Sequence, residues 1–332
     1  MGKAGWIVAR LLGAWLACAA LPAIAGEACA TSADPAAGMG ARVGAIACAE
    51  NALWGAPFID NDGRLASMTV GEAEQSLLAD RATPAWRRVV DYWRGSGLLW
   101  GMGQRAGARE CALPDSAPAL AACRGFVVDT PWSAAFVSWV LVRAGVPGFR
   151  PSASHVDYVR DALRQPGGPY TLADPDTTAP APGDLLCFSR QPAVRDYAGL
   201  RALLAGAPQS GLAMHCDIVA ATDLVHGRAY LVGGNVLQGA TLRVLNLNRK
   251  GLFWDLPRRG PGCGPADPAG CSFNRQDWVA LLKLRPMAVP ANAPPLREPV
   301  PTAPCCEVCT LPMPPGMQRC PAPDADGAQT AP

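Results

Sequence analysis

The apolar residues of this 332-residue chain change their spacing near residue 165, and this change limits the fold classes open to it. Before that point they recur at helical spacing, and after it they form short runs typical of strands. The helical segments are 69–82, 84–93, 132–144 and 155–164, and the strand-like runs are 184–188, 215–220, 229–232 and 242–245. Helices followed by neighbouring strands predict an α+β domain with a small antiparallel sheet.

The segment 132–144 is the best defined of these helices. Asp129 or Thr130 can cap it, Pro131 suits its first position, and Gly145 suits its end. Because the segment is apolar almost all round, we expect it to be a central, buried helix.

Other parts of the chain are richer in loop-forming residues. The capping box Thr69-Val70-Gly71-Glu72 predicts that the first helix begins there, and Pro84 can begin the second. The glycines of 95–103 predict a long loop before the central helix. From Pro286 onward 13 of 47 residues are proline, which predicts an extended tail. The expected organisation is a leader (1–25), an N-terminal loop segment (26–47), the α+β domain (48–285) and the Pro/Cys-rich tail (286–332).

The leader resembles a signal peptide. Lys3 and Arg10 flank an apolar stretch that ends in the small-x-small site Ala23-Ile24-Ala25. We therefore expect a soluble exported protein, either periplasmic or secreted. A lipoprotein anchored through Cys18 is a weaker alternative. No later stretch reaches the roughly 20 apolar residues that a membrane-spanning helix needs.

Cleavage of the leader would leave twelve of the 13 cysteines. In an exported protein disulfides are favoured over a zinc site, even at Cys306-x-x-Cys309. Candidate local pairs are Cys29 with Cys48, Cys111 with Cys123, and Cys187 with Cys216 if their strands lie opposite each other. The other candidates are Cys263, Cys271, Cys305, Cys306, Cys309 and Cys320, and their connectivity stays open.

Charge and motif content exclude several functions. Lys and Arg number 29 against 27 Asp and Glu, with no basic stripe, which argues against nucleic-acid binding. No phosphate-binding loop or His-Glu-x-x-His motif is present, so we expect neither a cofactor nor a metal. The sequence makes no prediction of oligomeric state.

Candidate catalytic residues come from three segments. Ser133 lies in the first turn of the central helix, where unpaired N–H groups and the helix dipole favour a nucleophile and an oxyanion. His215 begins a strand and Asp217 shares its face, whereas Cys216 points to the other face. Asn235 follows two glycines and can direct its amide at His215, as an orienting group does. We expect Ser133 as nucleophile, His215 as base, Asn235 as its orienting group and Asp217 as support.

Two further residues are weaker candidates for substrate binding. Trp132 can stack on a sugar, although a core position is the simpler interpretation. His155 can contact substrate, although it also suits the entry of a helix. His226 lies in a polar segment and is expected on the surface.

These segments, in this order, resemble the CHAP and NlpC-type papain-fold amidohydrolases of bacterial cell walls. The resembling segments are Pro131-Trp132-Ser133-Ala134-Ala135-Phe136-Val137-Ser138-Trp139-Val140, Pro182-Gly183-Asp184-Leu185-Leu186, the strand led by His215, and Gly234-Asn235. The resemblance implies a papain-like fold and hydrolysis of an amide bond in cell-wall peptide. Residues 48–285 also resemble the bacterial domain-of-unknown-function family 2272, through segments like Pro-Trp-Ser-Ala-Ala-Phe, His-Cys-Asp-Ile-Val and Gly-Gly-Asn-Val.

The chain departs from the amidase pattern at the nucleophile, because Ser133 stands where those enzymes have cysteine. A hydroxyl is far less ionised than a thiol near neutral pH and needs an aligned base. Three hypotheses remain open. The protein is a serine hydrolase using Asn235 or Asp217, a papain-fold domain that binds peptide or glycan without cutting it, or a structural exported protein.

Overall fold

The computed structural model describes residues 29, 38–68, 70–72, 76–113, 116–207, 209, 211–260, 262–293, 296, 305–306 and 318–319. The expected leader, including Cys18, lies outside these residues, as do the side chains of the four tail cysteines. The chain divides into a unit that ends at Ala293 and a second unit, Pro294–Pro332. The second unit holds the short parallel strands β9 (Cys305–Cys306) and β10 (Gln318–Arg319).

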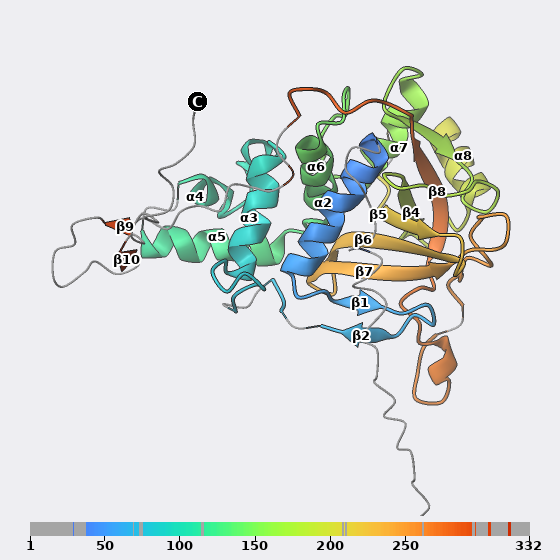
Figure 1. The fold of residues 1–332 in the computed structure, drawn as a ribbon, viewed down its shortest axis with the longest axis horizontal. Coiled ribbons are helices and arrows are strands. Elements are labelled where there is room, and N and C mark those ends of the chain that lie inside the picture. The colour runs from blue at the N-terminus through green and yellow to red at the C-terminus, as the bar shows by residue number, and fades with distance from the viewer. Residues whose placement is uncertain are drawn as a thin grey trace, which may run out of the picture. The chain divides into compact units, whose positions relative to one another are not determined.

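One sheet of eight strands forms the centre of the first unit (Figure 1). Its strands are β1 (Phe58–Ile59), β2 (Leu65–Ser67), β3 (Tyr170–Ala173), β4 (Leu185–Ser189), β5 (Met214–Asp223), β6 (Arg228–Val236), β7 (Gly239–Asn246) and β8 (Asp277–Leu284). Their order is β2-β1-β7-β6-β5-β4-β8-β3, with β1 parallel to β7 and all other pairs antiparallel. The α+β class is confirmed, but the sheet is larger than expected and mixed. The four predicted runs correspond to β4, β5, β6 and β7, which are adjacent at its centre.

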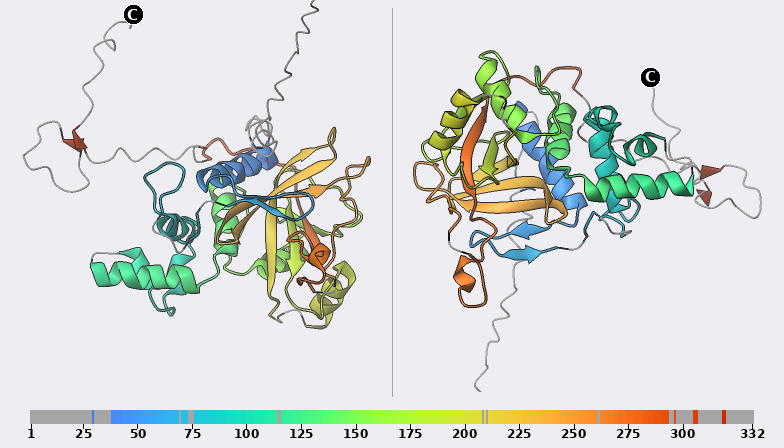
Figure 2. Two further views of the ribbon diagram at one scale, coloured as in Figure 1. Left: turned by 90° about the horizontal axis from the view of Figure 1, so that it is seen from below. Right: turned by 180° about the vertical axis from the view of Figure 1, so that it is seen from behind.

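Seven helices are defined by the described residues of this unit. They are α2 (Met39–Leu53), α3 (Ala85–Gly95), α4 (Ala108–Ala112), α5 (Ala117–Asp129), α6 (Ser133–Ala144), α7 (His155–Arg164) and α8 (Tyr197–Gly206). Helices α2 and α6 pack on each other and on β5 and β6 (Figure 1). Helices α3, α4 and α5 lie together on the opposite side of the unit from α7 and α8 (Figure 2). The 3₁₀ turns Leu99–Met102 and Pro268–Gly270 occur in the connections.

The central helix forms as predicted, one residue shorter. Nearly all residues of α6 are buried, and Gly145 ends it in a left-handed conformation with φ 75°. The predicted cap is wrong, because Trp132 occupies the cap position without a side-chain bond. Asp129 instead ends α5, and Thr130 follows it.

Three expected segments are corrected. Helix α2 lies largely within the expected loop 26–47. It packs closely against β5, so a Cβ on Gly44 would lie 2.1 Å from the Ala220 carbonyl oxygen. No helix forms at 70–72 and 76–82, the described residues of the expected helix 69–82. Leu77 instead forms an isolated antiparallel β-bridge with Pro84. The expected long loop before α6 contains α4 and α5.

Four disulfides join described cysteines. They are Cys29–Cys48, Cys111–Cys123, Cys187–Cys216 and Cys263–Cys271. The three candidate local pairs are therefore confirmed. Cys187 and Cys216 pair because they lie directly opposite each other on β4 and β5.

Within the described ranges, no single helix is long and apolar enough to span a bilayer. Helices α5 and α6 pass such a test only when taken together, and they meet at an angle of 99°.

Candidate functional site

The N-termini of α6 and α7 meet at Ser133 and His155. Each is the first residue of its helix, α6 and α7 respectively. The Ser133 Oγ atom lies 2.8 Å from the His155 Nε2 atom, and both residues are buried, with 8% and 3% of their surface exposed. Helix N-termini carry partial positive charge and unpaired N–H groups, so an anion formed here is stabilised.

This pairing corrects the predicted base. His155, expected at most to contact substrate, is the hydrogen-bond partner of Ser133, whereas His215 Nε2 lies 2.8 Å from Asp217 Oδ1. The two imidazole rings are neighbours, with centroids 5.2 Å apart. The structure thus brings Ser133, His155, His215 and Asp217 together, with His155 between Ser133 and His215.

Asp217 is held as an anion by Arg243, which was not predicted. Arg243 Nε lies 2.9 Å from Asp217 Oδ2, and both side chains are almost fully buried. Burial alone would raise the pKa of Asp217, but the Arg243 charge, His215 and the hydrogen bonds from both outweigh it and hold the pKa well below its usual range. Arg243 also donates to Asn274 Oδ1 at 2.9 Å. An arginine inside an otherwise apolar strand run was the sequence signal for this partner.

The carboxylate fixes the orientation of the His215 ring. A carboxylate oxygen can only accept, so His215 Nε2 donates to Asp217 Oδ1. The Nδ1 atoms of both His155 and His215 are buried without a hydrogen-bond partner among the described residues. Burial lowers the pKa of His155 strongly, and the neighbouring His215 lowers it further. His155 is therefore neutral near pH 7 and able to accept the Ser133 proton.

Asn235 holds the start of α6 rather than a histidine. In the amide orientation that satisfies both neighbours, its oxygen accepts from the Trp132 backbone N–H at 3.2 Å and its nitrogen donates to Glu72 Oε2 at 3.2 Å. The Glu72 carboxylate also accepts from the indole N–H of Trp132. The expectation that Asn235 orients His215 is therefore wrong.

Trp132 is a core residue. It has no exposed surface and stacks on Trp54 with ring centroids 5.6 Å apart, which agrees with the simpler interpretation and contradicts the weaker one, stacking on a sugar. His226, as expected, lies on the surface, where it pairs with Asp223 at 2.6 Å.

The Gly233-Gly234 pair permits a close approach to this site. A Cβ on Gly233 would lie 1.9 Å from Asp217 Oδ1, and one on Gly234 would lie 2.3 Å from the Phe136 Cβ. Neither glycine has a positive φ, which occurs next to them at Asn235 (55°). Space beside Asp217, more than turn formation, requires glycine here.

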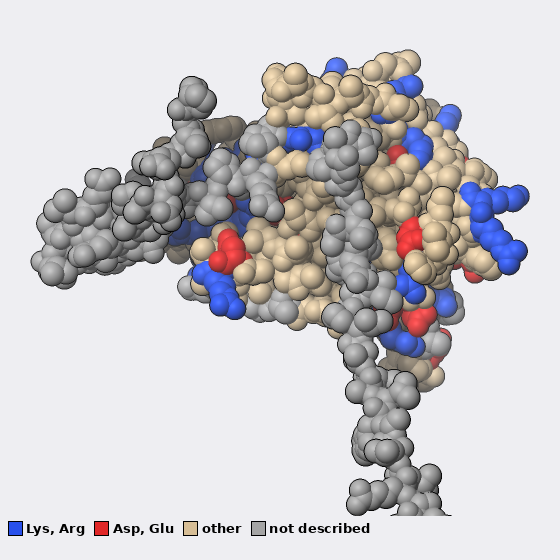
Figure 3. Space-filling view, viewed as in Figure 1, with Lys and Arg blue, Asp and Glu red and all other residues tan. Residues whose placement is uncertain are grey.

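A pocket of about 380 Å³ opens beside His215. It lies where β4 and β6 end and β5, β7 and β8 begin. Ser133 is not among the residues that line it. On the face seen in Figure 3, Lys and Arg are interspersed with Asp and Glu, as the balanced net charge suggests.

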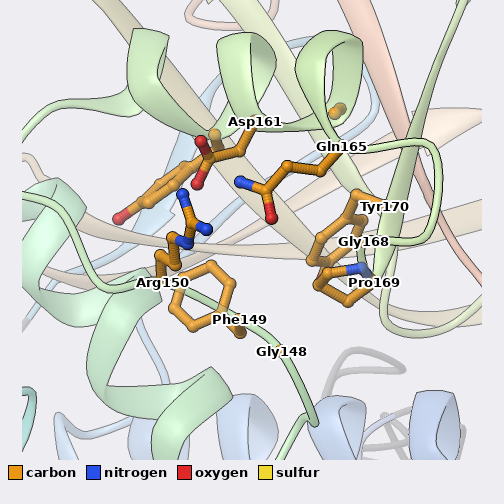
Figure 4. Close-up of a pocket in the computed structure, with 10 residues that line it drawn as sticks. Gly148, Phe149, Arg150, Asp161, Gln165, Gly168, Pro169 and Tyr170 are labelled. Atoms are coloured by element: carbon orange, nitrogen blue, oxygen red, sulfur yellow. The ribbon is translucent and has the colours of Figure 1, made fainter.

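A second pocket beside α7 is too small for a substrate. Its volume is about 20 Å³, room for about one water molecule. Figure 4 shows Arg150, Asp161 and Gln165 turned toward one another in this pocket, with Phe149 and Tyr170 also lining it.

A family model matches residues 80–284, a segment that includes Ser133, His155, His215 and Asn235. No curated protein and no solved structure is significantly similar to the chain, so the resemblance to papain-fold amidohydrolases is not confirmed. The matched segment covers more than half of the chain. The chain therefore belongs to the family described as "uncharacterized protein conserved in bacteria (DUF2272)".

Proposed function

We propose that this protein hydrolyses amide or peptide bonds, with Ser133 as nucleophile and His155 as general base. The observation that carries the proposal is the 2.8 Å separation of Ser133 Oγ and His155 Nε2 at the start of α6. A serine hydroxyl needs an unprotonated base at hydrogen-bond distance, and burial holds His155 in that form.

In the proposed reaction, Ser133 Oγ attacks the carbonyl carbon while His155 Nε2 takes the hydroxyl proton. The carbonyl oxygen becomes an oxyanion, which the first-turn N–H groups of α6 stabilise. The C–N bond then breaks, His155 gives the proton to the leaving amine, and the acyl group remains as an ester on Ser133. Attack by water, with His155 again as base, releases the acid and restores the hydroxyl.

The buried Asp217 carboxylate, paired with Arg243, supports the charge that this reaction creates. His155 becomes an imidazolium when it takes the proton, and the Asp217 carboxylate favours that charged form.

Cell-wall peptide is the first substrate to test. The motif order of the chain resembles that of cell-wall amidohydrolases, and four disulfides together with the signal-like leader support a location outside the cytoplasm.

The test is labelling by a fluorophosphonate, which reacts with activated serine hydroxyls, with mass spectrometry to locate the label. We expect modification at Ser133 that is lost in His155→Gln. Ser138→Ala, a serine change in the same helix, should still be labelled at Ser133 if folding is unchanged by circular dichroism. Mass spectrometry of the soluble products of purified peptidoglycan then tests the substrate. Absence of label at Ser133 in the folded protein would overturn the proposal.

The second candidate is binding without hydrolysis. It is favoured by the 8% exposure of Ser133 and by its absence from the lining of the pocket beside His215. This alternative predicts that peptidoglycan fragments bind equally to the wild-type chain and to Ser133→Ala, and that no hydrolysis products form.

A further inference from the structure

The pocket beside His215 is lined by an excess of positive side chains. Arg190, Arg243 and Arg259 contribute to its wall, together with the amides of Asn235 and Gln276. None of the described residues that line it is acidic. Its volume of about 380 Å³ is sufficient for a small organic group.

The three arginines differ in how far their charge is already neutralised. Arg243 is paired with the buried Asp217. Arg259 lies 3.4 Å from Asp277 Oδ2, a contact without hydrogen-bond geometry, since that oxygen has no hydrogen-bond partner among the described residues. Arg190 forms no ion pair with any residue in the described part of the chain, and its guanidinium lies 5.9 Å from the ring of Phe188.

The electrostatics of Arg190 are consistent with an unneutralised site. Burial lowers its pKa, Arg259 lowers it further, and Asp217 partly opposes both. Two guanidinium groups therefore repel each other at this pocket, and an anion between them would relieve the repulsion. Arginine binds planar carboxylates with two parallel hydrogen bonds.

His215 provides a second, independent indication of a ligand. Its ring lines the pocket, and its Nδ1 atom is buried without a hydrogen-bond partner among the described residues. Buried polar atoms are rarely left unpaired, so a polar group of a ligand is a suitable partner for this nitrogen.

We propose that this pocket binds a carboxylate of the substrate through Arg190 and Arg259. The substrate class is then an N-acyl amino acid or peptide whose free carboxylate lies close to an amide. The substrate assignment rests on the proposed amide hydrolysis, whereas the carboxylate site itself does not.

The test uses the Ser133→Ala chain, so that binding is measured without turnover. The probes are N-benzoylglycine, its uncharged amide N-benzoylglycinamide, and inorganic phosphate, each titrated by calorimetry. We expect the carboxylate to bind about tenfold more tightly than the amide, and Arg190→Gln to remove that preference, as loss of one charge-assisted hydrogen bond predicts. Arg249→Gln is the matched control, because Arg249 is exposed and does not line the pocket.

Three results would overturn the carboxylate site. They are equal binding of the acid and its amide, an unchanged preference in Arg190→Gln, and tighter binding of phosphate than of N-benzoylglycine. The two proposals fail separately. Fluorophosphonate labelling of wild-type Ser133 without a carboxylate preference rejects only the pocket, and a carboxylate preference without labelling rejects only the hydrolase.

Discussion

Replacement of Asp217 by asparagine should cost much of the stability of the domain. The carboxylate accepts from His215 Nε2 at 2.8 Å and from Arg243 Nε at 2.9 Å, and the amide would turn an N–H group toward one of these donors. Each charge-assisted hydrogen bond contributes about 1.5–3 kcal/mol. Arg243 is 3% exposed, and a buried charge that loses its partner costs about 3–5 kcal/mol. These terms overlap, so we expect Asp217→Asn to lower the free energy of unfolding by about 3–5 kcal/mol.

The measurement is urea unfolding of the oxidised protein, followed by circular dichroism and tryptophan fluorescence. Asp176→Asn is the matched control, because Asp176 pairs with Arg258 on the surface, where the side chains are 49% and 35% exposed. An exposed pair contributes at most about 1 kcal/mol. If Asp217→Asn lowers the free energy of unfolding no more than this control does, Asp217 and Arg243 do not form the buried pair described above.

The same pair predicts how stability depends on pH. The pKa of folded Asp217 lies below the unfolded value of about 3.9, so the charged carboxylate stabilises the fold above that pH. This contribution is lost as the pH falls below about 4 toward the folded pKa. The stability difference between wild type and Asp217→Asn should therefore be full at about pH 7 and smaller at about pH 3. A difference that grows on acidification would contradict this assignment.

Three further changes test the site. Gly233→Ala places a Cβ where it would lie 1.9 Å from Asp217 Oδ1. We therefore expect the free energy of unfolding in urea to fall by about 2 kcal/mol or more, and fluorophosphonate labelling of Ser133 to be lost. Unchanged labelling would contradict this expectation. His155→Gln should abolish labelling of Ser133, whereas His226→Gln, a change on the surface, should retain it. Because burial lowers the pKa of His155, the labelling rate of the wild type should not fall when the pH is lowered just below 6.5. Ser133→Cys should give a thiol that iodoacetamide alkylates slowly at neutral pH, because a neutral imidazole does not stabilise a thiolate anion. Fast alkylation would indicate a charged His155.

Elements with local signals were predictable from the sequence. Helix α6 is apolar and ends at a glycine, α7 follows its predicted range 155–164, and the runs that became β4 to β7 carry strand periodicity. Helix α2 was missed because its small residues serve a close approach to β5, which no local period reveals. Strands β1 and β2, of two and three residues, exist only because β7 offers β1 a parallel edge.

The site was only partly predictable for a related reason. Ser133, His215 and Asp217 were found because a helix start and a strand alternation are local patterns. The contact between Ser133 and His155 depends on how α7 meets α6, and the pairing of Asp217 with Arg243 crosses from β5 to β7. Such contacts are fixed by tertiary packing, and no spacing along the chain encodes them.

The geometry around Ser133 agrees with the serine hydrolysis proposed above, which needs no cysteine at this position. A catalytic thiol acts as a thiolate beside a protonated imidazole. Burial and the neighbouring His215 instead keep His155 neutral, which is the state that a hydroxyl 2.8 Å away requires of its base. Asp217, kept negative by Arg243, favours the imidazolium once the proton has moved. In the proposed hydrolase, Ser133, the neutral His155 and the buried Asp217 anion therefore suit a hydroxyl nucleophile better than a thiolate.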